Sequence, residues 1–132
     1  MLVKILSIDV WDEETGEADI IISVKNLKLC CFSDDSFDIE KEYDVSLSLL
    51  ASSWKISDKK EKFFIQEPDS YRTTIGGEIL DIQISGSDAI LTVASDGIII
   101  PVNIINIPAE ASFKKEQYII VNGRLDIMRG VQ

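Results

Sequence analysis

The fold of this chain is decided by residues 76–129, GGEILDIQISGSDAILTVASDGIIIPVNIINIPAEASFKKEQYIIVNGRLDIMR. Apolar, β-branched runs at 74–84, 88–94, 98–102 and 117–124 alternate with short turns, which is the pattern of β-strands. Ser85-Gly86-Ser87 predicts one turn, and Asp96-Gly97 is a strong hairpin signal. Pro101 has no N–H to donate, so its strand is expected at an edge or a bulge. The pair Gly76-Gly77 predicts a bulge or bend near the start of the first of these strands.

The N-terminal half carries a fainter copy of the same pattern. Runs at 2–11, 19–24 and 27–32 predict three strands, and the first turn closes around Gly16. Alternation over 43–49 predicts a half-buried strand, and 63–65 reads as a short one. Two segments stay open: 35–42 is a short helix or a polar connection, and 49–54 is strand or turn.

These patterns predict an all-β fold, a compact barrel or sandwich with at most one short helix. At 132 residues the chain is long enough to bury a core, so 1–132 is expected to form a single domain. Leu6–Val10 matches Leu80–Ile84, and 19–24 matches 88–93. The hypothesis that follows is a pseudo-repeat of 1–54 and 74–129, with a connection at 55–73. One barrel built by both halves is preferred, because two separate barrels would leave each half short of a core.

Three features of the second half are typical of one known architecture. They are the run Gly-Glu-Ile-Leu-Asp-Ile, the Asp96-Gly97 hairpin, and Phe113-Lys114-Lys115 ahead of the run from Tyr118 to Leu125. Together they resemble the first four strands of an OB-fold, over about two fifths of the chain. A fifth, closing strand is missing and would come from 63–65 or from the N-terminal half. The resemblance implies a barrel, and OB-folds often bind single-stranded nucleic acid.

The charge balance limits the partners that the chain can bind. The net charge is −10, and residues 1–44 hold twelve acids against four lysines. A surface this acidic repels polyanions, which argues against nucleic acid and anionic membranes. No apolar run approaches the ~20 residues of a membrane span. The N-terminal segment turns acidic too early for a signal peptide, so a cytoplasmic location is expected.

Two charged segments are candidates for an interaction surface. The first is an acidic hairpin with Asp12, Glu13, Glu14 and Glu17, which suits electrostatically steered binding to a basic protein. The second is the basic-aromatic stretch 54–72. Solvated loops have the same composition, so neither segment requires a partner. The members of the basic-aromatic stretch are Trp54, Lys55, Lys59, Lys60, Lys62, Phe63, Phe64, Tyr71 and Arg72.

The chain lacks the residues that most catalytic and metal sites use. It has no histidine, which removes Ser-His-Asp and Cys-His catalysis and the commonest zinc sites. It has no P-loop, no Gly-x-Gly-x-x-Gly and no calcium-loop spacing. Ser52-Ser53-Trp54-Lys55 matches the Ser-x-x-Lys of serine β-lactamases, but the two further motifs of that class are missing. Cys30 and Cys31 are adjacent, which suits a strand with one thiol buried and one facing elsewhere.

These observations predict a binding protein rather than an enzyme, with no cofactor and no metal. The expected function is protein–protein interaction, in which the acidic half meets a basic partner. An immunity-type inhibitor of a toxin, or a subunit of a larger assembly, would fit this description. The alternative is an OB-like single-stranded nucleic-acid binder that uses 54–72. A homodimer through an edge strand such as 98–102 is a further expectation.

Overall fold

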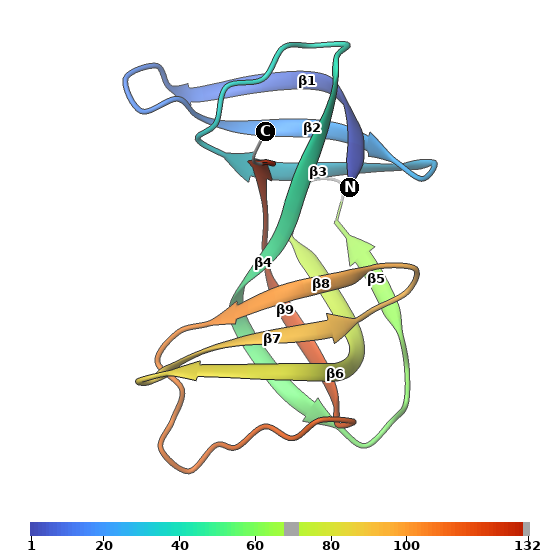
Figure 1. Cartoon of the computed structure of the whole chain (residues 1–132), viewed down its shortest axis with the longest axis vertical. Coiled ribbons are helices and arrows are strands. Elements are labelled where there is room, and N and C mark those ends of the chain that lie inside the picture. The colour runs from blue at the N-terminus through green and yellow to red at the C-terminus, as the bar shows by residue number, and fades with distance from the viewer. Residues whose placement is uncertain (68–71, 131–132) are drawn as a thin grey trace. The chain divides into compact units, whose positions relative to one another are not determined.

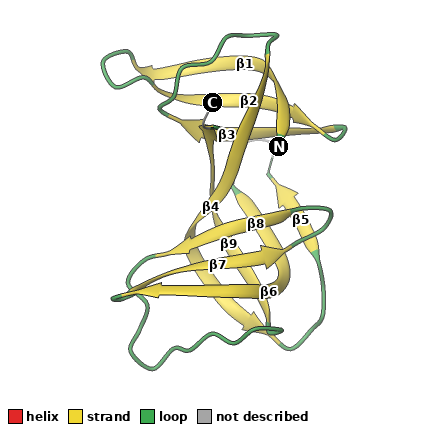
Figure 2. Cartoon of the chain, in the orientation of Figure 1, coloured by secondary structure: helices red, strands yellow, loops and turns green. Residues whose placement is uncertain are grey.

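The computed structural model describes residues 1–67 and 72–130, and these residues form β-strands and no helix (Figure 2). The all-β prediction is therefore confirmed. In the described residues, no helix is long and apolar enough to cross a membrane. The strands are β1 (Leu2–Asp12), β2 (Glu17–Val24), β3 (Leu27–Ser33), β4 (Glu42–Ser57), β5 (Phe63–Gln66), β6 (Thr73–Ser85), β7 (Asp88–Ala94), β8 (Ile99–Ile104) and β9 (Tyr118–Arg129).

The chain divides into two compact units, and unit 1 comprises residues 1–47 and 125–132. Its first three strands form an antiparallel meander (Figure 1). β3 then lies parallel to β9, where Phe32 is paired with Asp126. β9 neighbours β4, and β4 returns to β1 in antiparallel register, with Leu2 opposite Asp44. The strand order β1-β2-β3-β9-β4 therefore closes into a ring of five.

Unit 2 comprises residues 48–124 and is built in the same order. β6, β7 and β8 form an antiparallel meander, and β8 lies parallel to β4, where Leu49 is paired with Val102. β4 neighbours β9, and β9 pairs with β6 in antiparallel register, with Thr73 opposite Gly123. This order, β6-β7-β8-β4-β9, also closes into a ring of five. β5 is outside the ring and pairs with β6.

Two long strands take part in both rings. β4 contributes its residues up to Leu47 to unit 1 and its residues from Ser48 to unit 2. β9 does the reverse, with its residues up to Arg124 in unit 2 and those from Leu125 in unit 1. The strand that closes unit 2 therefore comes from the N-terminal half of the sequence, which was one of the two sources expected. The other segment that could have closed the ring, 63–65, belongs to β5, which pairs with β6 outside the ring.

Strict alternation of apolar residues explains which faces are buried. In β2 the inward positions Ala18, Ile20, Ile22 and Val24 are buried, and the residues between them are partly exposed. Successive side chains of a strand point to opposite faces, so this pattern directs one face of the ribbon into the core. Fully burying each such aliphatic side chain stabilises the fold by about 1.5–3 kcal/mol relative to exposure.

The two units also share details of local geometry. Register shifts interrupt the first hairpin of each unit at Leu6 and at Leu80. Ile5 N–H donates to Lys41 O at 3.0 Å, and Ile79 N–H donates to Gln117 O at 2.8 Å. Glu40 and Glu116, which precede these acceptors, both have positive φ, at 70° and 74°. Each unit therefore joins the connection before its fourth strand to its first strand in the same way.

Three local features are clearer in the structure than in the sequence. Residues 35–42 form no helix: residues 35–41 are a polar connection, the other alternative, and Glu42 begins β4. The pair Gly76-Gly77 forms no bulge; Gly76 instead lies under the Phe63 ring, where a Cβ would overlap the ring. Gly123 lies within β9, which continues through it to Arg129, and a Cβ there would overlap the Leu50 carbonyl oxygen. At Gly76 and Gly123, the absence of a side chain lets a neighbouring group lie close to the strand backbone: the Phe63 ring at Gly76 and the Leu50 carbonyl at Gly123.

Candidate interaction surface

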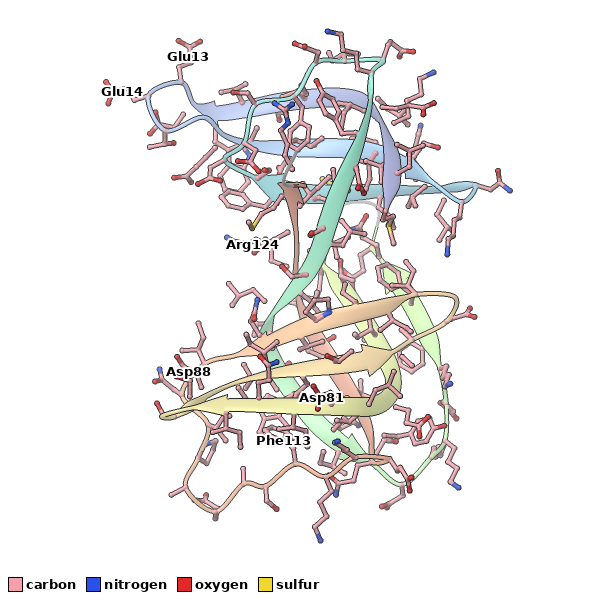
Figure 3. All side chains as sticks on the ribbon, in the orientation of Figure 1. Glu13, Glu14, Asp81, Asp88, Phe113 and Arg124 are labelled. Atoms are coloured by element: carbon pink, nitrogen blue, oxygen red, sulfur yellow. The ribbon has the colours of Figure 1, made fainter. Side chains whose placement is uncertain are left out.

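The acidic hairpin connects β1 to β2, and its residues have different roles. Asp12 shapes the turn, since its carboxylate accepts the Glu14 amide at 2.9 Å and its carbonyl accepts the Gly16 amide at 2.9 Å. The Thr15 hydroxyl accepts the Glu17 amide at 3.3 Å. Glu13 and Glu14 are exposed at the tip of the hairpin (Figure 3). Asp12 therefore holds the turn, and Glu13 and Glu14 present charge.

A row of carboxylates crosses the outer face of unit 1 next to this hairpin. Asp9 of β1 lies opposite Asp19 of β2, Asp19 lies opposite Phe32 of β3, and Phe32 is paired with Asp126 of β9. Like charges placed directly opposite each other on neighbouring strands destabilise a sheet. Asp9, Asp19 and Asp126 are not among the residues that the sequence predicts for the interaction surface. Their common row depends on the register, which the sequence alone does not specify.

An aromatic pair lies on the same outer face. The Trp11 and Phe32 rings are 5.2 Å apart between centroids and tilted by 51°. Trp11, one of the two tryptophans of the chain, is 56% exposed. Exposed tryptophan beside a second aromatic ring is typical of the residues that carry binding energy in protein interfaces. Unit 1 therefore combines an exposed aromatic pair with surrounding carboxylates.

Both cysteines are buried, so the expectation of a single buried thiol is wrong, although the two side chains point to opposite faces of β3 as expected. Cys31 lies opposite the buried Ile20, and Cys30 lies opposite Ile21 on the outer side, yet it is only 4% exposed. Burial, together with the Asp19 and Asp9 carboxylates, raises the pKa of the Cys30 thiol to about 12. Burial likewise raises the pKa of Cys31. Both thiols are neutral at physiological pH, and thiols of this kind are poor nucleophiles and metal ligands.

The basic-aromatic stretch lies in unit 2, where its aromatic rings have packing partners. Trp54 contacts Phe113, with ring centroids 4.8 Å apart, and Phe63 covers Gly76. Lys55, Lys59 and Lys60 are exposed at the end of β4 and in the turn that follows it. Lys62 is exposed too and Phe64 is half-buried, whereas Tyr71 lies outside the described residues. Trp54 is thus only partly available to stack on a base.

The edge expected at 98–102 is part of β8. This strand pairs with β7 along its length, from Ile99 to Ile104, and with β4 at Val102 and Asn103. Pro101 lies opposite Thr92 of β7. A homodimer through this strand stays a prediction.

Charge is distributed unequally between the two units. Unit 1 has thirteen acids against five basic residues, whereas unit 2 has ten acids against eight. Most of the net charge of −10 therefore belongs to unit 1. Within the described part of the chain, no group of three or more Cys, Asp or Glu residues is arranged to hold a metal ion. Comparison with protein-family models, with curated proteins and with solved structures finds no match to this chain.

Proposed function

We propose that the protein is a binding module without catalytic activity, and that unit 1 binds a basic partner protein. The observation that carries this proposal is the outer face of unit 1, where the Trp11–Phe32 pair lies beside the row Asp9–Asp19–Asp126. Natural sheets avoid opposed like charges because they cost stability. Within the row only Asp9 and Asp19 lie directly opposite each other. A positively charged partner would remove the cost of this pair, which supports a role of the pair in binding.

The two parts of this surface have separate tasks in binding. Carboxylates at the rim attract a cationic partner over a distance of about one Debye length, roughly 8 Å at physiological salt, and so raise the association rate. The aromatic pair supplies apolar area at the centre, where truncation of a good anchor costs 2 kcal/mol or more. Association is therefore expected to depend on salt, and dissociation on Trp11.

We further propose that each unit is an OB-like barrel. Its support is the order of pairing, a three-stranded meander followed by a parallel contact to the closing strand, in both units. OB-folds bind ligands on the face of their second and third strands and on the loop between the first two strands. In unit 1 these elements are β2, β3 and the acidic hairpin. The acids of the hairpin and of β2 fit a cationic ligand and oppose the nucleic acid that many OB-folds bind.

A charge-matched comparison tests the proposed partner class. In the test variant, Asp9→Asn, Glu13→Gln, Glu14→Gln and Asp19→Asn neutralise four acids of unit 1. In the control, Asp58→Asn, Glu61→Gln, Asp96→Asn and Glu110→Gln neutralise four exposed acids of unit 2. Affinity capture from a native lysate, with proteins identified by mass spectrometry, is expected to recover basic proteins with the wild type and the control. Equal recovery with the test variant would refute the role of unit 1.

The alternative, a single-stranded nucleic-acid binder that uses 54–72, stays a prediction and has a direct test. Fluorescence anisotropy with a labelled single-stranded oligonucleotide at low and at high salt measures it. Binding at low salt that Lys55→Gln, Lys59→Gln and Lys60→Gln abolish together would support this function. No binding at low salt would exclude it.

A further inference from the structure

A pocket of about 280 Å³ opens in unit 1 between the acidic hairpin and the connection that leads to β4. Its walls are apolar, from Ile8 and Val10 on β1, Ala18 and Ile20 on β2, and Phe37 on the connection. Glu13, Asp35 and Ser36 also line it. The pocket therefore combines an apolar interior with two carboxylates.

Contacts on both sides hold the walls of this pocket in place. On the hairpin side, Gly16 lies so close to the connection that a Cβ on it would come within 3.2 Å of the Asp34 carbonyl oxygen. On the other side, Arg129 of β9 donates its amide to the Asp35 carboxylate at 2.8 Å and its guanidinium to Ser36 O at 3.2 Å. A pocket fixed in this way loses little conformational entropy when it is filled.

The second unit contains a counterpart of this pocket that differs in charge. It has a volume of about 350 Å³ and is lined by Ile84 at the end of β6, Gly86 in the hairpin, and Phe113 on the connection to β9. Under the match of Leu6–Val10 to Leu80–Ile84, Ile84 corresponds to Val10. Phe113 precedes Glu116 by three residues, as Phe37 precedes Glu40. The remaining lining residues are apolar or serine, and none is charged. The carboxylates are therefore what distinguishes the pocket of unit 1.

We propose that the pocket of unit 1 receives one lysine or arginine side chain of the basic partner; this inference rests on the proposed function. The aliphatic stem of such a side chain contacts Ile8, Val10 and Phe37, and its cationic end reaches Glu13 and Asp35. Long basic side chains bury their methylene stems against apolar surface in this manner and keep the charged head near polar groups. Charge-assisted hydrogen bonds to carboxylates are about twice as strong as neutral ones.

Titration with a small probe tests the pocket apart from the partner. Acetyl-Gly-Arg-Gly-amide is added to the full-length 15N,13C-labelled protein, and acetyl-Gly-norleucine-Gly-amide, which has a similar stem without the charge, serves as control. The arginine probe is expected to shift the methyl signals of Ile8 and Val10 and to leave that of Ile84 unchanged. Glu13→Gln should weaken binding roughly two- to five-fold, the range for a partly exposed ion pair. Equal shifts with both probes, or equal shifts at Val10 and Ile84, would overturn the inference.

A blocking variant gives an independent measurement. Val10 is 51% exposed and Ile84 is 65% exposed, so Val10→Lys and the matched control Ile84→Lys are both compatible with folding. Val10→Lys should abolish the shifts caused by the arginine probe, and Ile84→Lys should preserve them. If the probe does not bind but partner capture still requires the acids of unit 1, the pocket inference fails and the proposed function stands. If the probe binds but the acids do not affect partner capture, the proposed function fails.

Discussion

Gly16 and Gly86 occupy the first hairpin turns of the two units, and both have positive φ, at 78° and 63°. A Cβ at Gly16 would come within 3.2 Å of the Asp34 carbonyl oxygen, whereas a Cβ at Gly86 would meet nothing within 4 Å. Gly86→Ala therefore adds only the strain of a left-handed residue, about 1 kcal/mol. Gly16→Ala adds displacement of the connection to this strain, so it should destabilise the protein by about 2 kcal/mol.

Urea unfolding followed by circular dichroism measures both glycine variants. The comparison is internal, because backbone strain is common to both turns and only the neighbouring carbonyl differs. Equal losses of unfolding free energy in the two variants would mean that the contact between the hairpin and the connection does not contribute to stability.

The Cys30 thiol gives the protein a dependence on alkaline pH. Its pKa is raised to about 12 by burial and by the Asp19 and Asp9 carboxylates, whereas an unfolded thiol titrates near roughly 8.5. Between roughly pH 8.5 and about 12, the Cys30 thiol is ionised in the unfolded protein and still protonated in the folded protein. The free energy of unfolding therefore falls as the pH rises through this range. The loss is about 1.4 kcal/mol per pH unit.

Cys30→Ala separates this effect from the other groups that titrate at high pH. Between pH 7.5 and pH 10 the unfolding free energy of the wild type should fall by about 2 kcal/mol more than that of the variant. Cys31 remains in both proteins and cancels from the difference. The same pH dependence in both would show that the Cys30 thiol is already ionised in the folded state or equally perturbed in the unfolded one.

The connection 34–41 is an element that holds its shape without regular secondary structure. Asp38 N–H donates to the Tyr43 hydroxyl at 2.9 Å, the Phe37 ring meets the Tyr43 ring edge-on at 5.1 Å, and the Arg129 guanidinium lies 4.8 Å from the Tyr43 centroid. Tyr43→Phe keeps the ring contacts and removes the hydroxyl. The expected loss is about 1 kcal/mol, the net value of one hydrogen bond.

Tyr118→Phe is the matched control, since the Tyr118 hydroxyl has no hydrogen-bond partner among residues 1–67 and 72–130. Thermal or urea unfolding should leave this variant unchanged and lower the midpoint of Tyr43→Phe. A Tyr43→Phe protein as stable as the control would indicate that water replaces the hydroxyl as the acceptor for Asp38.

Alternation of apolar and polar residues predicted most strands of this protein. It gave no clear prediction where a strand has no buried residues, as in β4 after Leu49. Residues 2–11, 19–24 and 88–94 were predictable as strands because one face of each is apolar. The segment 49–54 stayed open because alternate burial ends at Leu49. Beyond Leu49, β4 still neighbours β9. The Ser52 hydroxyl donates to Asn122 O and the Asn122 side-chain amide donates to the Ser53 hydroxyl, at 3.1 Å each and across about seventy residues of sequence. Such a distant partner leaves no local signal in the sequence.

The candidate surface was predictable in its charge and not in its geometry. Composition alone indicated an acidic N-terminal half, and the Gly16 turn placed Glu13 and Glu14 at one tip. The Trp11–Phe32 contact crosses from β1 to β3, with β2 between them, so it depends on the registers of two strand pairs. Asp126 comes from β9, whose predicted end at Arg124 is five residues before its end at Arg129.

At the scale of the whole molecule, the shared strands couple the stability of the two units. Residues up to Leu47 of β4 and those from Leu125 of β9 complete the ring of unit 1, while the remaining parts of the same strands complete the ring of unit 2. Loss of either ring would release strand ends that continue directly into the other. We therefore expect a single cooperative transition, as in small single domains, rather than two independent ones.

The two tryptophans of the chain allow each unit to be followed separately, because Trp11 lies in unit 1 and Trp54 lies in unit 2. Trp54→Phe leaves Trp11 as the reporter of unit 1, and Trp11→Phe leaves Trp54 as the reporter of unit 2. In each variant, the urea midpoint from tryptophan fluorescence should equal the midpoint from far-ultraviolet circular dichroism. Both midpoints come from the same protein, so destabilisation by the substitution affects them equally. A fluorescence midpoint that precedes the circular dichroism midpoint in one variant and follows it in the other would mean that each ring unfolds on its own. In that case β4 and β9 would connect the two rings covalently, but the stability of one ring would not depend on that of the other.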